Sequence, residues 1–324
     1  MSEELKLLPE EEQTERSSSA SRWLTVKALL RDPVTFFSVF VLLVILISAV
    51  GAEVVAPHDP LDQDLNRRNL PPWSYATDEN DMPVGRVYIL GTDPLGRDIL
   101  SRMIFGARVS ITVGLTSAIV SGLIGSLLGV LAGYYRGGID DIIMRLVDIQ
   151  MSIPVLLLAL LVLFALGPGF LNLVVVLAIV RWMAYARLAR GQTLAFRNLP
   201  FIDAAIAIGS SNRRIILRHI IPNVASPLII LGTLEIAGLI LSEAGLSFLG
   251  FGIQLPRASW GLMISGGRDY ITTAWWNITF PGIVIFLTTL SLNLFAASLR
   301  SISDPVQRER WFRKETMAAA ESAE

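Results

Sequence analysis

The chain lacks cysteine altogether and has only three lysines and two histidines among its 324 residues. The absence of cysteine excludes disulfides and thiol chemistry. None of the three lysines (Lys6, Lys27 and Lys314) follows a glycine-rich loop, so we expect no phosphate-binding loop in this chain. His58 and His219 lie far apart, and neither belongs to a His-Glu-x-x-His pattern, which argues against a metal-dependent hydrolase.

Charge is also scarce, whereas apolar residues are abundant. Only 17% of the residues are charged and the net charge is −1, so overall charge gives no sign of a nucleic-acid partner. Hydrophobic residues make up 52% of the chain, and the mean hydropathy is +0.56. This composition is too apolar for a typical soluble domain. It predicts an all-α, polytopic membrane protein.

Six segments are long and apolar enough to cross a hydrocarbon core of about 30 Å. They cover residues 33–55, 107–134, 141–166, 170–187, 222–246 and 277–299. The chain therefore divides into an N-terminal tail (1–32), a first span (33–55), a polar excursion (56–106), a five-helix core (107–299) that contains a loop at 191–221, and a C-terminal tail (300–324). Both tails have the polar composition of partly disordered segments.

The distribution of basic residues predicts how the chain is oriented in a cell membrane. Six arginines and only one acidic residue, Asp203, lie between Arg187 and His219. Loops rich in basic residues stay on the cytoplasmic side. Six spans place both termini on that same side, and the excursion at 56–106, in which acids outnumber arginines, lies outside. We therefore expect a multi-pass protein of the plasma or inner membrane with both termini in the cytoplasm.

The basic loop has the features of a short helix. Pro200 suits the first turn, where its missing N–H costs no hydrogen bond, and Gly209 can end the helix in the left-handed conformation. Helical spacing places four apolar residues roughly along one face: Phe201, Ile202, Ala205 and Ile208. Such a helix can enter a groove on a partner protein. The alternative is that it lies on the membrane surface.

The spacing within this loop resembles a family signature. Permease subunits of ATP-binding-cassette (ABC) importers carry Glu-Ala-Ala, three residues, Gly, nine residues and Ile-x-Leu-Pro. Here Asp203-Ala204-Ala205, Gly209 and Ile221-Pro222 fall at those spacings, although Asp203 replaces Glu, and His219 and Ile221 replace Ile and Leu. The resemblance implies that the loop forms a coupling helix that docks on an ATPase subunit. The implied coupling residues are Phe201, Asp203, Ala204, Ala205 and Gly209.

Other stretches resemble the dipeptide/oligopeptide branch of the same family. They are residues 214–223, 243–252 and, typical of its C-type subunit, 90–102 with 106–110. The resemblance covers about residues 30–305 and implies the type I ABC-importer permease fold. At the end of the excursion, Thr92 or Asp93 can cap a helix whose first turn holds Pro94. We favour this structural role over direct contact with substrate.

The resemblance also implies which other subunits would form a transport complex with this chain. The chain is expected to be a non-catalytic subunit without catalytic, cofactor-binding or metal-binding residues. ATP and Mg would be bound by one or two separate ATP-binding subunits. A second related permease subunit would complete the pathway, and an extracytoplasmic binding protein would deliver a peptide substrate. Membrane lipid surrounds the spans.

A few polar residues and one proline within or next to the spans are candidates for the pathway or its gate. Glu235 lies deepest; it can meet the amino end of a peptide, or it can be a hydrogen-bonded packing residue. Glu243 begins a stretch expected outside the membrane, where it suits a gate or a contact with the binding protein. Pro154 should bend the third span, which can serve gating. Arg181 needs a partner inside the membrane.

Three further points stay open at this stage. Arg145 and Asp148 have the i, i+3 spacing of a helical ion pair and are expected to bridge at the interface. An ion-coupled secondary transporter or channel that acts without an ATPase is the alternative function, and it would use Glu235, Asp148 and Arg181. The sequence does not distinguish among dipeptides, longer peptides, glutathione, nickel complexes and sugars as cargo.

Overall fold

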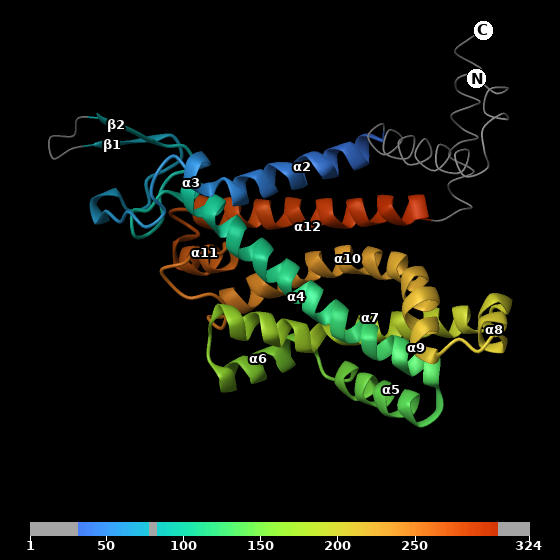
Figure 1. Cartoon of the computed structure of the whole chain (residues 1–324). Helices are drawn as coiled ribbons and strands as arrows, with labels where there is room; N and C mark the ends of the chain where they lie inside the picture. The colour runs from blue at the N-terminus through green and yellow to red at the C-terminus, as the bar shows by residue number, and fades with distance from the viewer. Residues whose placement is uncertain (1–31, 78–82, 304–324) are drawn as a thin grey trace, which may run out of the picture.

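The computed structural model describes residues 32–77 and 83–303. Almost all of the predicted tails, with all of their basic residues except Arg300, lie outside the described residues. The described chain forms a bundle of long helices with a two-stranded sheet at one end and two short helices, α8 and α9, at the other (Figure 1). We call these ends the sheet end and the loop end.

Helices make up most of the described chain. The long helices are α2 (Pro33–Val50), α4 (Ile99–Tyr135), α5 (Gly137–Met151), α6 (Val155–Leu166), α7 (Phe170–Arg197), α10 (Ile221–Phe248) and α12 (Trp276–Ser303). The short elements are α3 (Ala52–Val55), η2 (Leu65–Arg67), β1 (Ser74–Thr77), β2 (Pro83–Tyr88), α8 (Pro200–Ala207), α9 (Asn212–Ile215), the π-helix η3 (Ile216–Ile220), α11 (Trp260–Gly267) and η4 (Arg268–Tyr270).

Five helices of the described chain are long and apolar enough to cross a membrane, or six if α5 and α6 together form one span. These two helices are bent by 91° at the break between them. The predicted third span is therefore a broken helix. This count confirms the prediction of a polytopic all-helical protein, to which the structure adds the small antiparallel sheet of β1 and β2.

The first span begins at a well-formed cap. The Asp32 carboxylate accepts hydrogen bonds from the Thr35 backbone N–H (2.9 Å) and from the Thr35 hydroxyl (2.6 Å). The hydroxyl bond is the main cause of a lowered pKa of Asp32. Pro33 occupies the first helical position, where it needs no donor. The charged cap thus fixes where the apolar helix starts.

Helices α4 and α7 pack closely because α4 presents glycines to α7. A Cβ atom on Gly125 would lie 2.2 Å from the Trp182 carbonyl oxygen, and one on Gly129 would lie 2.2 Å from the Ala186 carbonyl oxygen. Side chains larger than hydrogen would therefore collide with the backbone of α7. Small residues spaced four apart allow such a close approach between helices in lipid.

Helix α4 starts later than the predicted cap. Its N-cap is Asp98, whose side chain accepts from the Ser101 N–H at 2.8 Å. The Asp93 carboxylate is used differently: it accepts from the Leu95 N–H and pairs with the Arg97 Nε at 2.7 Å. The predicted cap at Thr92 or Asp93 is wrong because the side chain of Asp93 folds the preceding loop.

Candidate functional site

Helix α8 has the predicted start and end. Pro200 lies at its first position, and Gly209 follows its end with φ +85°. The Gly209 N–H donates to the Ile206 carbonyl and the Ser210 N–H to the Ala205 carbonyl. These two bonds form a Schellman motif, which needs a left-handed residue at the glycine position. A side chain at Gly209 would meet no neighbour, so the backbone conformation is what favours glycine here.

The apolar face of α8 is divided between the chain itself and the outside. Ile202 is fully buried and packs with Tyr134, Ile215 and Ile220, and half-buried Ala205 joins the same cluster. Four residues were predicted to form one face for a partner. Ile202 and Ala205 instead face the chain itself, and only Phe201 and Ile208 are exposed. The centre of that face anchors the helix, because the loop folds back onto the loop end of α4.

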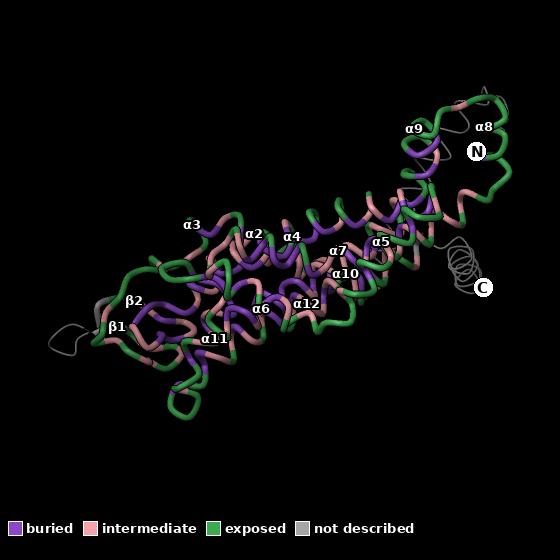
Figure 2. Tube along the Cα trace, turned by 90° about the horizontal axis from the view of Figure 1, so that it is seen from below, coloured by how far each residue is buried: buried purple, intermediate pink, exposed green. Residues whose placement is uncertain are grey.

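The outer surface of α8 remains open. Phe201 and Ile208 are exposed, Ile208 by 85%, and so is Ile206. Asp203 and Ala204 are exposed as well. Figure 2 shows that α8 and α9 project beyond the long helices. Exposed apolar side chains at the tip of a projecting loop are typical of a docking surface.

The loop is joined to the fifth span without a break. Residues 212–248 form one continuous helical segment in which η3 links α9 to α10. The buried anchor Ile202 packs against α9 and η3, and the Phe201 ring lies 6.3 Å from the His219 ring in η3. A displacement of α8 would therefore be transmitted to α10. π-Helical turns inside helices are frequent at functional sites.

Glu235 of α10 meets Arg181 of α7 inside the bundle. Arg181 Nη1 lies 3.4 Å from Glu235 Oε2, and the Arg181 Nη2 lies 3.4 Å from the Ser242 hydroxyl. The side chain of Arg181 is 27% exposed and that of Glu235 only 12%. Arg181 thus has the partner that its depth requires, and Glu235 is held by a charge of its own chain. Sequence analysis singled out both residues but did not pair them.

Glu243 has a different environment from the one predicted. It is fully buried, and its carboxylate accepts from the Ser110 hydroxyl at 3.0 Å and the Ser247 hydroxyl at 2.7 Å. The Ser110 hydroxyl in turn accepts from the Trp260 N–H of α11. The stretch that Glu243 begins keeps its predicted role as a gate or a contact with the binding protein, but the Glu243 side chain itself cannot make such a contact, because α4, α10 and α11 enclose it. Its place is that of a polar link between these helices.

Pro154 lies at the break between α5 and α6 and is exposed, as are Ser152 and Ile153. Beside the break, the Gln150 amide donates to the Ile179 carbonyl, and the Trp182 indole donates to the Gln150 side chain. The bend predicted at Pro154 is therefore present, as a break of 91° between α5 and α6.

The ion pair predicted between Arg145 and Asp148 is replaced by a pair between helices. Asp148 of α5 lies 2.6 Å from Arg187 of α7. Asp140 of α5 forms a second ion pair between these helices, in which both of its carboxylate oxygens accept hydrogen bonds from Arg190. Both arginines lie toward the loop end of α7, so α5 is fixed to α7 by charge there.

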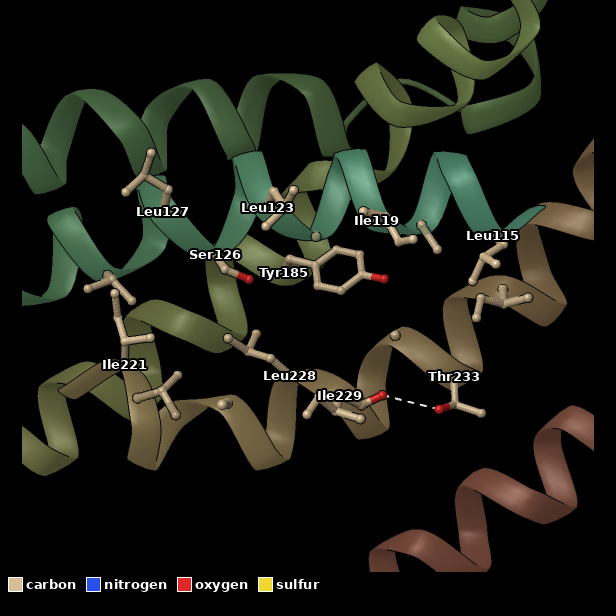
Figure 3. A pocket seen from close by; sticks show the side chains of 17 residues that line it. Leu115, Ile119, Leu123, Ser126, Leu127, Tyr185, Ile221, Leu228, Ile229 and Thr233 are labelled. Atoms are coloured by element: carbon tan, nitrogen blue, oxygen red, sulfur yellow. Dashed lines mark hydrogen bonds between the residues drawn. The ribbon is translucent and has the colours of Figure 1, made fainter. Parts of the chain in front are cut away.

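An apolar groove runs between α4 and α10 (Figure 3). Its volume is about 680 Å³, and its walls include the exposed side chains of Leu123 and Ile229. Tyr185 of α7 lies at its floor. The sequence pattern assigns no role to this tyrosine, although a hydroxyl in an apolar span, one helical turn from Arg181, is a signal that singles it out.

His58 and His219 lie at opposite ends of the molecule. His58 lies 3.5 Å from Asp98 at the sheet end, whereas His219 is in η3 at the loop end. No group of three His, Cys, Asp or Glu side chains within residues 32–77 and 83–303 is placed to hold a metal ion.

Two family models match the chain. Residues 125–309 match the model for the inner membrane component of binding-protein-dependent transport systems. Residues 21–72 match the model for the N-terminal transmembrane domain of oligopeptide transport permease C. The first match covers the helices from the second half of α4 to the last span, including the whole α8 loop.

Three relatives match the chain over most of their length. The chain is 38% identical to the probable D,D-dipeptide transport system permease DdpC of Escherichia coli K12 over 94% of this chain and 97% of that protein. It is 40% identical to the di/tripeptide transport system permease DppC of Pseudomonas aeruginosa over 82% and 85%, respectively. It is 39% identical to the glutathione transport system permease GsiD of another Escherichia coli strain over 83% and 84%.

Proposed function

Because the chain belongs to the permease subunits of peptide ABC importers, we propose that α8 is the coupling helix on which a separate ATPase subunit docks. The observation that carries this proposal is the shape of the loop. Exposed Phe201 and Ile208 border a helix whose centre is anchored by Ile202 and whose end is fixed by Gly209. Exposed Asp203 and Ala204 complete the proposed coupling surface, and half-buried Ala205 packs beneath it.

The continuity between the loop and α10 supports a mechanism for coupling. When ATPase subunits close on ATP, a docked α8 would move with them. Because α9, η3 and α10 are one segment, that motion would reach Glu235 in the bundle. Glu235 and the break at Pro154 are our candidates for the pathway or its gate, and they are supported by their depth and by the bend between α5 and α6. Glu243 lies farther along α10, where the hydrogen bond that it accepts from Ser110 links α10 to α4 and α11.

The permease acts as a non-catalytic subunit, and its family implies an ATPase and further components. We propose in detail a second related permease subunit, one or two subunits that bind ATP and Mg, and an extracytoplasmic binding protein. The loop end would face the cytoplasm together with both termini, and the sheet end would face the binding protein. The charge of the α8 loop supports this orientation.

Peptides are the cargo class that we propose. The printed names of the relatives differ in cargo: a D,D-dipeptide, di- and tripeptides, and glutathione. Their common feature is a short peptide. An ion-coupled transporter that works alone is set aside, because the family of this chain transports with an ATPase.

Co-purification tests the coupling helix. A tagged chain, extracted gently from its native membrane, should bring a related permease and one or two ATPases, identified by mass spectrometry. Gly209→Val should lose the ATPases and keep the related permease, because a β-branched residue resists φ +85°. The spans should stay folded, since space at Gly209 is open.

The chain offers a matched control for this variant. Gly250 ends α10 at the sheet end with φ +88° and with the same pair of hydrogen bonds, from the Gly250 and Phe251 N–H groups to the Ser247 and Leu246 carbonyls. Gly250→Val should therefore keep the ATPases. Retention of the ATPases by Gly209→Val, or their loss from both variants, would contradict the assignment of α8.

A further inference from the structure

The groove between α4 and α10 carries a polar group that lipid could not satisfy. Tyr185 is 2% exposed, and its hydroxyl has no hydrogen-bond partner among the described residues. Ser121 lies beside it and donates its own hydrogen to the Ser117 carbonyl, so it offers Tyr185 only an acceptor oxygen, which is not in hydrogen-bond geometry in this structure. A buried hydroxyl without a partner is costly, and more so where water is absent. An acyl chain in the groove would leave it unpaired.

Small residues keep the floor of the groove open around this hydroxyl. A Cβ atom on Gly232 of α10 would lie 3.6 Å from the Tyr185 hydroxyl, and one on Gly122 of α4 would lie 3.2 Å from the Tyr185 ring. In Figure 3 the ring of Tyr185 lies between the two helices, with Ser126 and Thr233 on the walls. The result is an apolar groove with a few polar groups, which is the usual composition of a site for small molecules.

A charged pair lies next to the same floor. Arg181 is one helical turn from Tyr185 on α7, and Glu235 is three residues from Gly232 on α10. The two side chains are 3.4 Å apart. Ionisable residues inside a membrane usually face a cavity or a partner. Here Arg181 and Glu235 are each other's partner beside the groove, and neither of them lines it.

We propose that the α4–α10 groove is a section of the transport pathway that receives the peptide, with the Tyr185 hydroxyl as its hydrogen-bonding group. Apolar side chains of the peptide would lie along the groove walls, and a backbone amide or terminal group would pair with the hydroxyl. This inference rests on the proposed peptide import. Because α10 forms one wall of the groove, a motion that passes from α8 through α9 and η3 to α10 would change the shape of the groove.

The natural absence of cysteine allows a direct test of access from water. Single cysteines at Ser126 and Thr233 would lie on the groove walls, whereas one at Leu161 would lie on the exposed surface of α6. In the assembled complex, a water-soluble, positively charged thiosulfonate should modify Ser126→Cys and Thr233→Cys but not Leu161→Cys. A defined mixture of di- and tripeptides should slow the modification. Groove cysteines as unreactive as Leu161→Cys would mean that lipid or a partner helix fills the groove. That outcome, or a reaction that peptides do not slow, overturns the proposal.

Removing the hydroxyl alone tests the role of Tyr185. Tyr185→Phe should lower uptake of the same peptide mixture, measured by mass spectrometry, by about three- to tenfold, the size expected for one neutral hydrogen bond. The thermal midpoint should not fall, because the hydroxyl has no partner to lose. Tyr135→Phe is the control: Tyr135 is 46% exposed and lies outside the groove. Unchanged uptake by Tyr185→Phe, or a fall in uptake that matches a fall in stability, overturns the proposal.

The two proposals fail in different ways. A chain that purifies without an ATPase contradicts the coupling helix, whatever happens at the groove. A complete complex that imports peptides while the groove cysteines stay unreactive contradicts the groove alone.

Discussion

At the scale of single residues, the buried carboxylate of Glu243 gives a sharp test of how the sheet end is held together. Its two serine partners also accept backbone bonds, Ser110 from Trp260 and Ser247 from Ile253. Each serine therefore connects the carboxylate to the chain that covers it. The carboxylate thus accepts from α4 and from its own helix α10, and Ser110 links it to α11.

Glu243→Ala should therefore be strongly destabilising. It leaves two buried hydroxyls without an acceptor and opens a cavity, at a cost of about 2–4 kcal/mol. Glu243→Gln keeps the shape and one carbonyl oxygen, so it should cost less than half as much. Thermal unfolding in mild detergent measures both. Equal losses of stability would show that the acceptor role is unimportant.

At the scale of elements, the attachment of α5 to α7 depends on two ion pairs of unequal burial. The Asp140 side chain is 12% exposed, and its contact with Arg190 has two points. Asp148 is 66% exposed and Arg187 is 53% exposed. Solvent screens the second pair and weakens it.

Asp140→Asn should thus cost more than Asp148→Asn. We expect about 1.5–3 kcal/mol for the first, the range for hydrogen bonds to charged groups, and less than about 1 kcal/mol for the second. Thermal midpoints of the two variants, compared at low and high salt, check this order. A larger effect at Asp148 would mean that the exposed pair has a role beyond attachment.

Some helix ends and bends could be predicted from the sequence, and others could not. The ends of α8 were predictable because Pro200 and Gly209 act through local backbone preferences. The start of α4 was not: Asp93 and Asp98 are equally good caps by type, and the choice depends on the Arg97 and Leu95 contacts of Asp93. The bend at Pro154 was predictable in place but not in size.

At the scale of the whole molecule, orientation in the membrane follows from which end carries the α8 loop. Cysteines introduced at exposed Tyr75 on β1 and exposed Arg213 on α9 would mark the two ends. In intact cells, an impermeant maleimide should label Tyr75→Cys, whereas Arg213→Cys should react only after the membrane is opened. The cysteine-free parent chain is the control for background. The reverse pattern would invert the proposed topology and remove α8 from the side where ATP is available.

The sequence by itself determined the membrane class, the approximate spans and the two ends of the helix in the α8 loop. These depend on long apolar runs, on the side that carries arginine and on backbone preferences at Pro200 and Gly209, all of which act over a few residues. The tertiary structure decided the rest. It paired Arg181 with Glu235 and Asp148 with Arg187, enclosed Glu243, and placed Tyr185 at the floor of a groove. These outcomes depend on which helix faces meet, and that is set by close packing between distant segments, such as the glycines of α4 against the backbone of α7.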